Sequence, residues 1–91
     1  MTVRYYSLRD SKVSFMNLQP FANDEAAIRN FRNALTDSTP NIVNRNPEDY
    51  SLYYVGDFDD VKGTFQPPIS SPGGEPLFLC NHLSFAQEAK K

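Results

Sequence analysis

Residues 46–59 read NPEDYSLYYVGDFD, and this run places a turn, an aromatic strand and an acidic segment one after another. Pro47 fixes the backbone angle φ, and the asparagine and aspartate around it favour local turn hydrogen bonds. The aromatic and β-branched residues that follow predict a central strand from Ser51 to Phe58. Gly56 lies inside this strand, and a glycine at such a position predicts a bulge or a close backbone approach.

The segments on either side of this run predict more of the same sheet. The acidic segment 59–63 predicts a hairpin turn into a short partner strand, Thr64–Gln66. Towards the N-terminus, the alternating residues Val3–Leu8 predict a first strand. Residues 13–21 are apolar at intervals but are interrupted by Pro20, which predicts a short edge strand or an extended connection.

The remaining segments carry weaker patterns. Residues 40–49 are expected to form a loop, and the proline-rich segment 67–76 a surface loop. Leu77–Cys80 predicts a last, buried strand, and residues 83–89 are expected to add one or two helical turns.

The clearest prediction is a helix over residues 24–36. Asn23 or Asp24 can cap it, and Ile28, Phe31 and Leu35 recur on one face. The polar residues of the opposite face are Glu25, Arg29, Arg32, Asn33 and Thr36. The whole pattern predicts a single domain over residues 1–91 of the α+β class, a small mostly antiparallel sheet of about four strands with one amphipathic helix packed on one face.

The balance of charge argues against a strong, sequence-independent nucleic-acid binder. The net charge is −2, whereas such binding is driven by neutralising phosphates and usually shows as a basic domain. The charge is unevenly distributed, because residues 1–45 hold six Lys/Arg and four Asp/Glu, while residues 46–91 hold three and seven. The sequence therefore allows a basic face formed by the first half of the chain but does not require one.

The composition also indicates where the chain works. A single cysteine, Cys80, cannot form an internal disulfide, which agrees with a reducing compartment. Charged residues interrupt the first fifteen positions, so no signal peptide is expected, and no apolar stretch reaches the length of a membrane span. The chain is expected to stay in a cytoplasm, away from membranes.

Two groups of residues invite a chemical interpretation, and for both a structural one is favoured. Asp57, Asp59 and Asp60 are carboxylates suited to a divalent metal, but their spacing fails the calcium-loop pattern and aspartates are common in hairpin turns. Cys80 and His82 supply only two ligands, whereas structural zinc needs about four. The neighbouring sequence also contains no residue recognisable as the orienting group of a catalytic pair. No catalytic, metal or cofactor-binding residue is predicted.

Three runs together resemble the small non-structural protein of gokushovirus-type microviruses. They are Arg4–Asp10, the helical run Ala27–Phe31, and Pro47–Asp59, which contains Asp-Tyr-x-Leu-Tyr-x-hydrophobic-Gly-x-Phe-Asp from Asp49 to Asp59. The resemblance spans residues 4–63 and does not extend to the segment after Gly63. It implies a protein of tailless phages with circular single-stranded DNA genomes, one that assists viral DNA synthesis or its coupling to packaging. The resemblance implies no enzyme activity.

The leading hypothesis is therefore a non-enzymatic accessory protein that contacts single-stranded DNA in the host bacterial cytoplasm. Arg29 and Arg32 share the solvent side of the predicted helix, one turn apart, although Glu25 can pair with Arg29. Tyrosines on two predicted strands offer rings that can stack on bases where they face away from the helix. The full set of expected contacts is Arg4, Arg29, Arg32 and Arg45 for phosphates, with Tyr5 and Tyr54 for stacking.

The alternative hypothesis is a protein–protein adaptor. It would bind a viral or host replication factor, or the viral procapsid, through the acidic hairpin and the proline loop. Exposed strand edges also leave homo-oligomerisation open.

Overall fold

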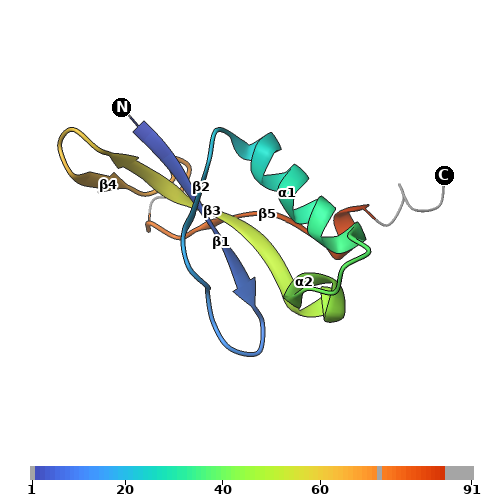
Figure 1. Cartoon of the computed structure of the whole chain (residues 1–91). Helices are drawn as coiled ribbons and strands as arrows, with labels where there is room; N and C mark the ends of the chain where they lie inside the picture. The colour runs from blue at the N-terminus through green and yellow to red at the C-terminus, as the bar shows by residue number, and fades with distance from the viewer. Residues whose placement is uncertain (1, 72, 86–91) are drawn as a thin grey trace.

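The computed structural model describes residues 2–71 and 73–85. These residues form a five-stranded sheet in which all paired strands are antiparallel, and one main helix lies across it (Figure 1). The strands are β1 (Thr2–Asp10), β2 (Gln19–Phe21), β3 (Tyr50–Asp59), β4 (Thr64–Gln66) and β5 (Leu77–Asn81). The predicted α+β class is confirmed.

β3 is the centre of the sheet, as the sequence predicted. One of its edges pairs with β1 along nearly the whole length of both strands, from Thr2 opposite Asp59 to Asp10 opposite Tyr50. Its other edge is divided, because β4 pairs with the C-terminal part and β5 with the N-terminal part. β2 lies on the outer side of β1, so the segment interrupted by Pro20 does supply an edge strand.

Gly56 marks a bulge in β3, as its position predicted. Tyr5 lies opposite Gly56, but the next residue, Tyr6, lies opposite Tyr54, so Val55 has no partner on β1. An extra residue of this kind shifts the alternation of side chains along the strand by one position. The bulge therefore decides which residues of β3 share a face.

The main helix, α1 (Asp24–Thr36), has the predicted bounds. The side chain of Asn23 caps it by accepting a hydrogen bond of 2.8 Å from the backbone N–H of Ala26. Ala27 and Phe31 are buried against the sheet, and Ile28, Ala34 and Leu35 are partly buried around them. The core thus lies between α1 and one face of the sheet.

The prediction of a plain loop over residues 40–49 is wrong. The segment forms a second helix, α2 (Ile42–Arg45), and a 3-10 helix, Pro47–Asp49. Asn41 caps α2 by accepting hydrogen bonds from the backbone N–H groups of Val43 and Asn44, and the Asn44 side chain accepts one from the backbone of Asn41. This reciprocal capping, with burial of Val43, stabilises a helix too short to show any periodicity.

The C-terminal segment differs from its prediction in two ways. β5 was expected to be buried, but only Cys80 is buried in it, since Phe78 projects from the side of the sheet that α1 does not cover. A 3-10 helix, His82–Phe85, stands where residues 83–89 were expected to begin a helix. Residues 86–89 of that prediction lie outside the described residues.

Candidate nucleic-acid interface

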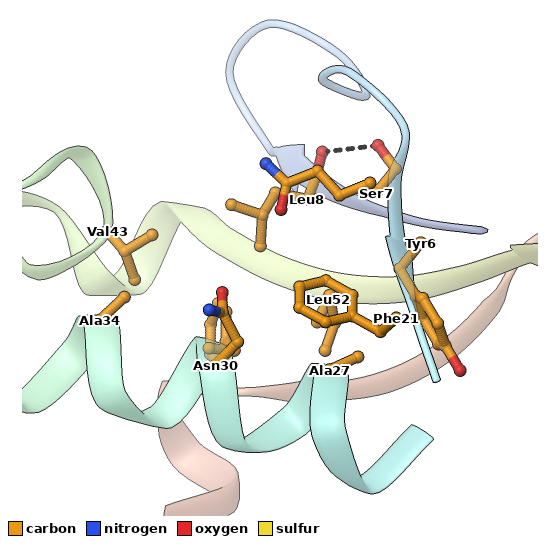
Figure 2. A pocket seen from close by; sticks show the side chains of 11 residues that line it. Tyr6, Ser7, Leu8, Phe21, Ala27, Asn30, Ala34, Val43 and Leu52 are labelled. Carbon is orange, nitrogen blue, oxygen red and sulfur yellow. Dashed lines mark hydrogen bonds between the residues drawn. The ribbon is translucent and has the colours of Figure 1, made fainter. Parts of the chain in front are cut away.

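A small cavity lies between α1 and the sheet, bordered by Tyr6, Phe21, Ala27 and Leu52 among others (Figure 2). Its volume is about 30 Å³. Such a space holds about one or two water molecules. This cavity is therefore too small to admit a nucleotide.

The predicted arginines on the helices lie at the surface. Arg29 and Arg32 are exposed on the solvent side of α1, one turn apart, as expected, and Arg45 is exposed at the end of α2. Glu25 lies beside Arg29 and Arg32 around the same shallow hollow, so the helix surface is not purely basic. Tyr5 lies on the far side of the sheet from α1, so these residues do not form one surface with it.

Arg4 links β1 to α1, and its side chain is 32% exposed. Its guanidinium donates to the hydroxyl of Tyr6 over 2.9 Å and to the carboxylate of Asp24 over 2.7 Å, and Tyr6 donates to the same carboxylate oxygen over 2.7 Å. Asp24 is the first residue of α1, where a carboxylate also suits the positive end of the helix dipole. A phosphate could bind Arg4 only by competing with this network.

Tyr54 is not the exposed stacking ring that the sequence suggested. It is 8% exposed, its ring centroid is 4.1 Å from the Arg4 guanidinium, and its hydroxyl donates to Asp57 over 2.6 Å. Burial and the bond to Asp57 raise the pKa of Tyr54 to about 12. Tyr54 shares the face of the buried Leu52 by simple alternation along β3, and the bulge beside Gly56 brings Asp57 onto that same face.

The network around Asp24 makes stability depend on pH. Desolvation opposes ionisation of Asp24, but the hydrogen bonds from Tyr6 and Arg4 outweigh it and hold the pKa of this carboxyl below its ordinary value. A depressed pKa in the folded state adds stability above the unfolded pKa of about 4, which is lost as the pH falls through the folded pKa. Both side chains are partly exposed, so solvent screens the pair and the effect is modest.

We therefore expect the acid-side decline of the unfolding free energy to be shallower in Asp24→Asn than in the unmodified chain. Urea unfolding followed by circular dichroism at several pH values below 5 measures it. The control is Glu48→Gln, which removes an exposed surface carboxylate and should leave the decline unchanged. Equal declines in Asp24→Asn and the unmodified chain would contradict the role given to the Arg4–Asp24 pair.

The acidic hairpin is organised as a turn. The Asp59 carboxylate accepts hydrogen bonds from the backbone N–H groups of Val61 and Lys62, and these bonds hold its pKa below the usual range. Asp57 accepts from Tyr54. Within the described ranges, no group of three His, Cys, Asp or Glu residues is placed to hold a metal ion. These contacts agree with the favoured interpretation of a hairpin turn.

Cys80 and His82 occupy different surroundings. Cys80 is buried in the core, and this burial raises the pKa of its thiol to about 11, so the thiolate needed for nucleophilic attack is scarce at neutral pH. His82 begins the 3-10 helix that follows β5. The arrangement fits the favoured interpretation of Cys80 as a small core residue.

The sheet has one face under α1 and one open face. α1 contacts β2, β3 and β5, and both α2 and the 3-10 helix at His82–Phe85 contact α1, so these helices gather on one side (Figure 1). Side chains alternate along a strand, and residues paired across strands share a face. By this register, the open face carries Val3, Tyr5, Ser7, Arg9, Pro20, Ser51, Tyr53, Gly56, Phe58, Phe65, Phe78 and Asn81. The β1–β2 connection covers one of them, Ser7, which is 2% exposed and donates to the carbonyl oxygen of Met16.

Charge divides unevenly between the two faces. The acidic strand residues Asp10, Asp57 and Asp59 all fall on the face that α1 covers. Among the strand residues of the described chain, the open face carries the cation Arg9 and no carboxylate. An anionic ligand would therefore meet no opposing charge from the strands on this face, although the chain as a whole is acidic.

Aromatic rings fill much of this open face. The ring of Tyr53 lies between those of Phe15 and Phe78, with centroid distances of 5.2 Å and 5.7 Å and interplanar angles of 77° in both pairs. Tyr5 and Phe58 form a second edge-to-face pair at 6.4 Å. Phe15 comes from the β1–β2 connection, where it bridges to Arg9. The Arg9 guanidinium lies 5.8 Å from the centroid of the Phe15 ring.

Of the six residues expected to contact DNA, this surface includes only Tyr5. Sequence reasoning missed Arg9, Phe15, Tyr53 and Phe78. One signal was present, because alternation along β1 puts Arg9 on the same face as Tyr5. A second signal was the alternation along β3, which puts Tyr54 on the same face as Leu52 and Tyr53 on the opposite face.

Comparison with known proteins shows a phage relationship. The family model described as "Phage ORF5 protein" matches residues 3–85. The chain is 45% identical over 71 residues to "Protein ORF5" of Chlamydia phage 1, an alignment covering 74% of this chain and 74% of that protein. No solved structure matches significantly.

These findings confirm the microvirus resemblance inferred from residues 4–63. The family match also extends past Gly63 through the proline loop and β5, so the view that the C-terminal third lies outside the family pattern was wrong. None of the described helices is long and apolar enough to cross a membrane.

Proposed function

Since the chain belongs to the phage ORF5 protein family, we propose that it is a non-enzymatic accessory protein that contacts single-stranded DNA during viral genome synthesis or packaging. The expected site of action is the host bacterial cytoplasm. The single observation that carries DNA contact is the charge division of the sheet, in which the open face has Arg9, exposed aromatic rings and no strand carboxylate. That combination suits a ligand that is anionic in its backbone and apolar in its bases.

This surface replaces the one expected from the sequence. Arg29 and Arg32 remain exposed, but the hollow that they border is lined by Glu25 and Ile28 and by no aromatic side chain. The open face combines a cation with rings, and nothing on its strands repels phosphate. It is therefore the better candidate for a continuous contact.

We expect a short fluorescent single-stranded oligonucleotide to bind at low salt with little sequence preference. The logarithm of affinity should fall with the logarithm of salt concentration by about 0.7 for each phosphate neutralised. Arg9→Ala should flatten that slope by about one phosphate contact, because it removes the cation of the open face. Fluorescence anisotropy over a salt series measures both the slope and the affinity.

The matched control is the double change Arg29→Ala and Arg32→Ala, which removes exposed cations from α1 and should leave the slope unchanged. A flattened slope in this control, with none in Arg9→Ala, would move the contact to α1. If a protein with a normal circular dichroism spectrum does not bind the oligonucleotide at low salt, the proposal of direct DNA contact is wrong.

A protein–protein adaptor is the second candidate. Val61 in the β3–β4 turn and Ile69 in the proline loop are both exposed apolar side chains. These are the two segments that the sequence analysis expects to bind a replication factor or the procapsid. If DNA binding is absent, this hypothesis becomes the leading one.

A further inference from the structure

We infer that the open face holds DNA mainly through its unpaired bases, which stack on the rings around Tyr53. This inference rests on the proposed contact with single-stranded DNA and specifies which part of the nucleic acid is recognised. It identifies the ligand class as unpaired nucleobases, and Phe15 and Phe78 as the residues that receive them.

The charge of the surface limits what phosphates can contribute. The strand residues of the open face supply one cation, Arg9. Binding driven by phosphate neutralisation alone would need several cations and usually comes from a basic domain, whereas this chain carries a net charge of −2. Affinity for DNA at this surface has to come chiefly from contacts with bases.

The rings that could receive bases are exposed despite their size. Phe15 is 43% exposed, Phe65 43% and Phe78 53%. Each leaves apolar surface in water, and covering that surface with a flat base is favourable. Three large aromatic residues exposed on one sheet face are more than the scattered apolar side chains that monomers normally show.

The arrangement around Tyr53 fits stacking. Phe15 and Phe78 stand at 77° to the Tyr53 ring on either side of it. In an edge-to-face contact only one of the two rings uses a face, so the cluster is held in place without closing every ring face to a ligand. Arg9 lies beside Phe15, where its guanidinium can bind a phosphate adjoining a stacked base.

Stacking selects the state of the DNA more than its sequence. In a duplex the faces of the bases are already stacked on their neighbours, so they are not available to a protein ring. Every unpaired base has a π-face, so the contact tolerates any sequence. The expected ligand is therefore single-stranded DNA of mixed sequence.

A second copy of the chain is the competing occupant of an exposed apolar face. A two-fold contact through this face would bring two copies of Arg9 into one interface, and the strands of the face offer no carboxylate to pair with them. A strand with apolar bases and anionic phosphates complements the same surface without that conflict.

The test compares three probes of equal length by fluorescence anisotropy: a mixed-sequence single strand, a strand with the same backbone but no bases, and a duplex. The single strand should bind at least about tenfold more tightly than either other probe, since each stacked base contributes about that factor or more. Phe15→Leu and Phe78→Leu should each weaken binding of the single strand about tenfold, while leaving the salt slope unchanged.

Phe15→Tyr and Phe78→Tyr are the matched controls, because each keeps a ring, and both should bind almost as tightly as the unmodified chain. Both positions are well exposed, so all four variants are expected to fold, and thermal unfolding checks this. Sedimentation equilibrium of the unmodified chain and Phe78→Leu reports self-association.

Equal affinity for the strands with and without bases would overturn the stacking inference while leaving DNA contact in place. Unchanged affinity in both leucine variants would do the same. A dimer that Phe78→Leu dissociates, with no binding of any probe, would assign the face to a second copy and remove the proposed function as well.

Discussion

Replacing Phe31 with alanine should lower the free energy of unfolding by about 3–5 kcal/mol. Phe31 is 2% exposed, lies on the buried side of α1 and contacts the ring of Phe85 with centroids 6.4 Å apart. It also borders the cavity of about 30 Å³ under α1, so the lost ring would enlarge a space that the surrounding side chains have not closed. The cost should therefore lie towards the upper end of the range, because it rises with the volume of the remaining cavity.

A domain of this size has a total stability of only about 5–15 kcal/mol, so much of the Phe31→Ala population should be unfolded under mild denaturing conditions. Urea titration followed by circular dichroism measures the loss. Asn33→Ala, on the exposed side of the same helix, is the matched control and should change stability by less than about 0.5 kcal/mol. A Phe31→Ala variant as stable as this control would show that α1 does not supply the core.

Gly56→Ala should destabilise the chain by about 2–4 kcal/mol. Gly56 has φ of 156°, which side chains rarely adopt, and a Cβ atom there would lie 2.7 Å from the Phe65 ring and closer still to the carbonyl oxygen of Gln66. The carbonyl belongs to the backbone of β4, so relief requires the β3–β4 pair to move apart. Thermal and urea unfolding both report the change.

Gly63→Ala separates the steric effect from the conformational one. Gly63 also has a positive φ, 70°, but a Cβ atom there would have no neighbour within 4 Å. Its replacement should therefore cost only the conformational preference, about 1–2 kcal/mol. If the two variants lose equal stability, the close approach of β4 to the bulge has no energetic weight.

Local signals explain which elements could be predicted from the sequence. The helix at residues 24–36 has a capping residue, a three-to-four-residue apolar period and a following Pro40, all of which act within a few positions. The turn from β3 into β4 is similarly local, because Asp59 bonds the backbone of the residues that follow it. These elements appear with the predicted bounds, or within a residue or two of them.

The predictions that failed depended on distant contacts or on very short elements. α2 is stabilised by the exchange of hydrogen bonds between Asn41 and Asn44, in a segment whose composition is that of a loop. The contact of Tyr54 with Asp57 depends on the bulge, which shifts the alternation of side chains along β3 by one position, and the sequence does not show such a shift. The open face could not be predicted for the same reason. Its residues come from five strands, so the gathering of aromatic rings and the lack of strand carboxylates on it appear only after the strands are paired.

The pairing of β1 with β3 also affects how the chain folds as it is synthesised. Thr2 pairs with Asp59 and Asp10 with Tyr50, so β1 leaves the ribosome long before its principal partner exists. Until then only the short edge strand β2 is near in sequence, and closing the β1–β3 ladder requires the whole of α1 and α2 to form a loop between them. During this delay β1 presents unpaired backbone groups, and its charged residues Arg4, Arg9 and Asp10 reduce its tendency to pair with other nascent chains.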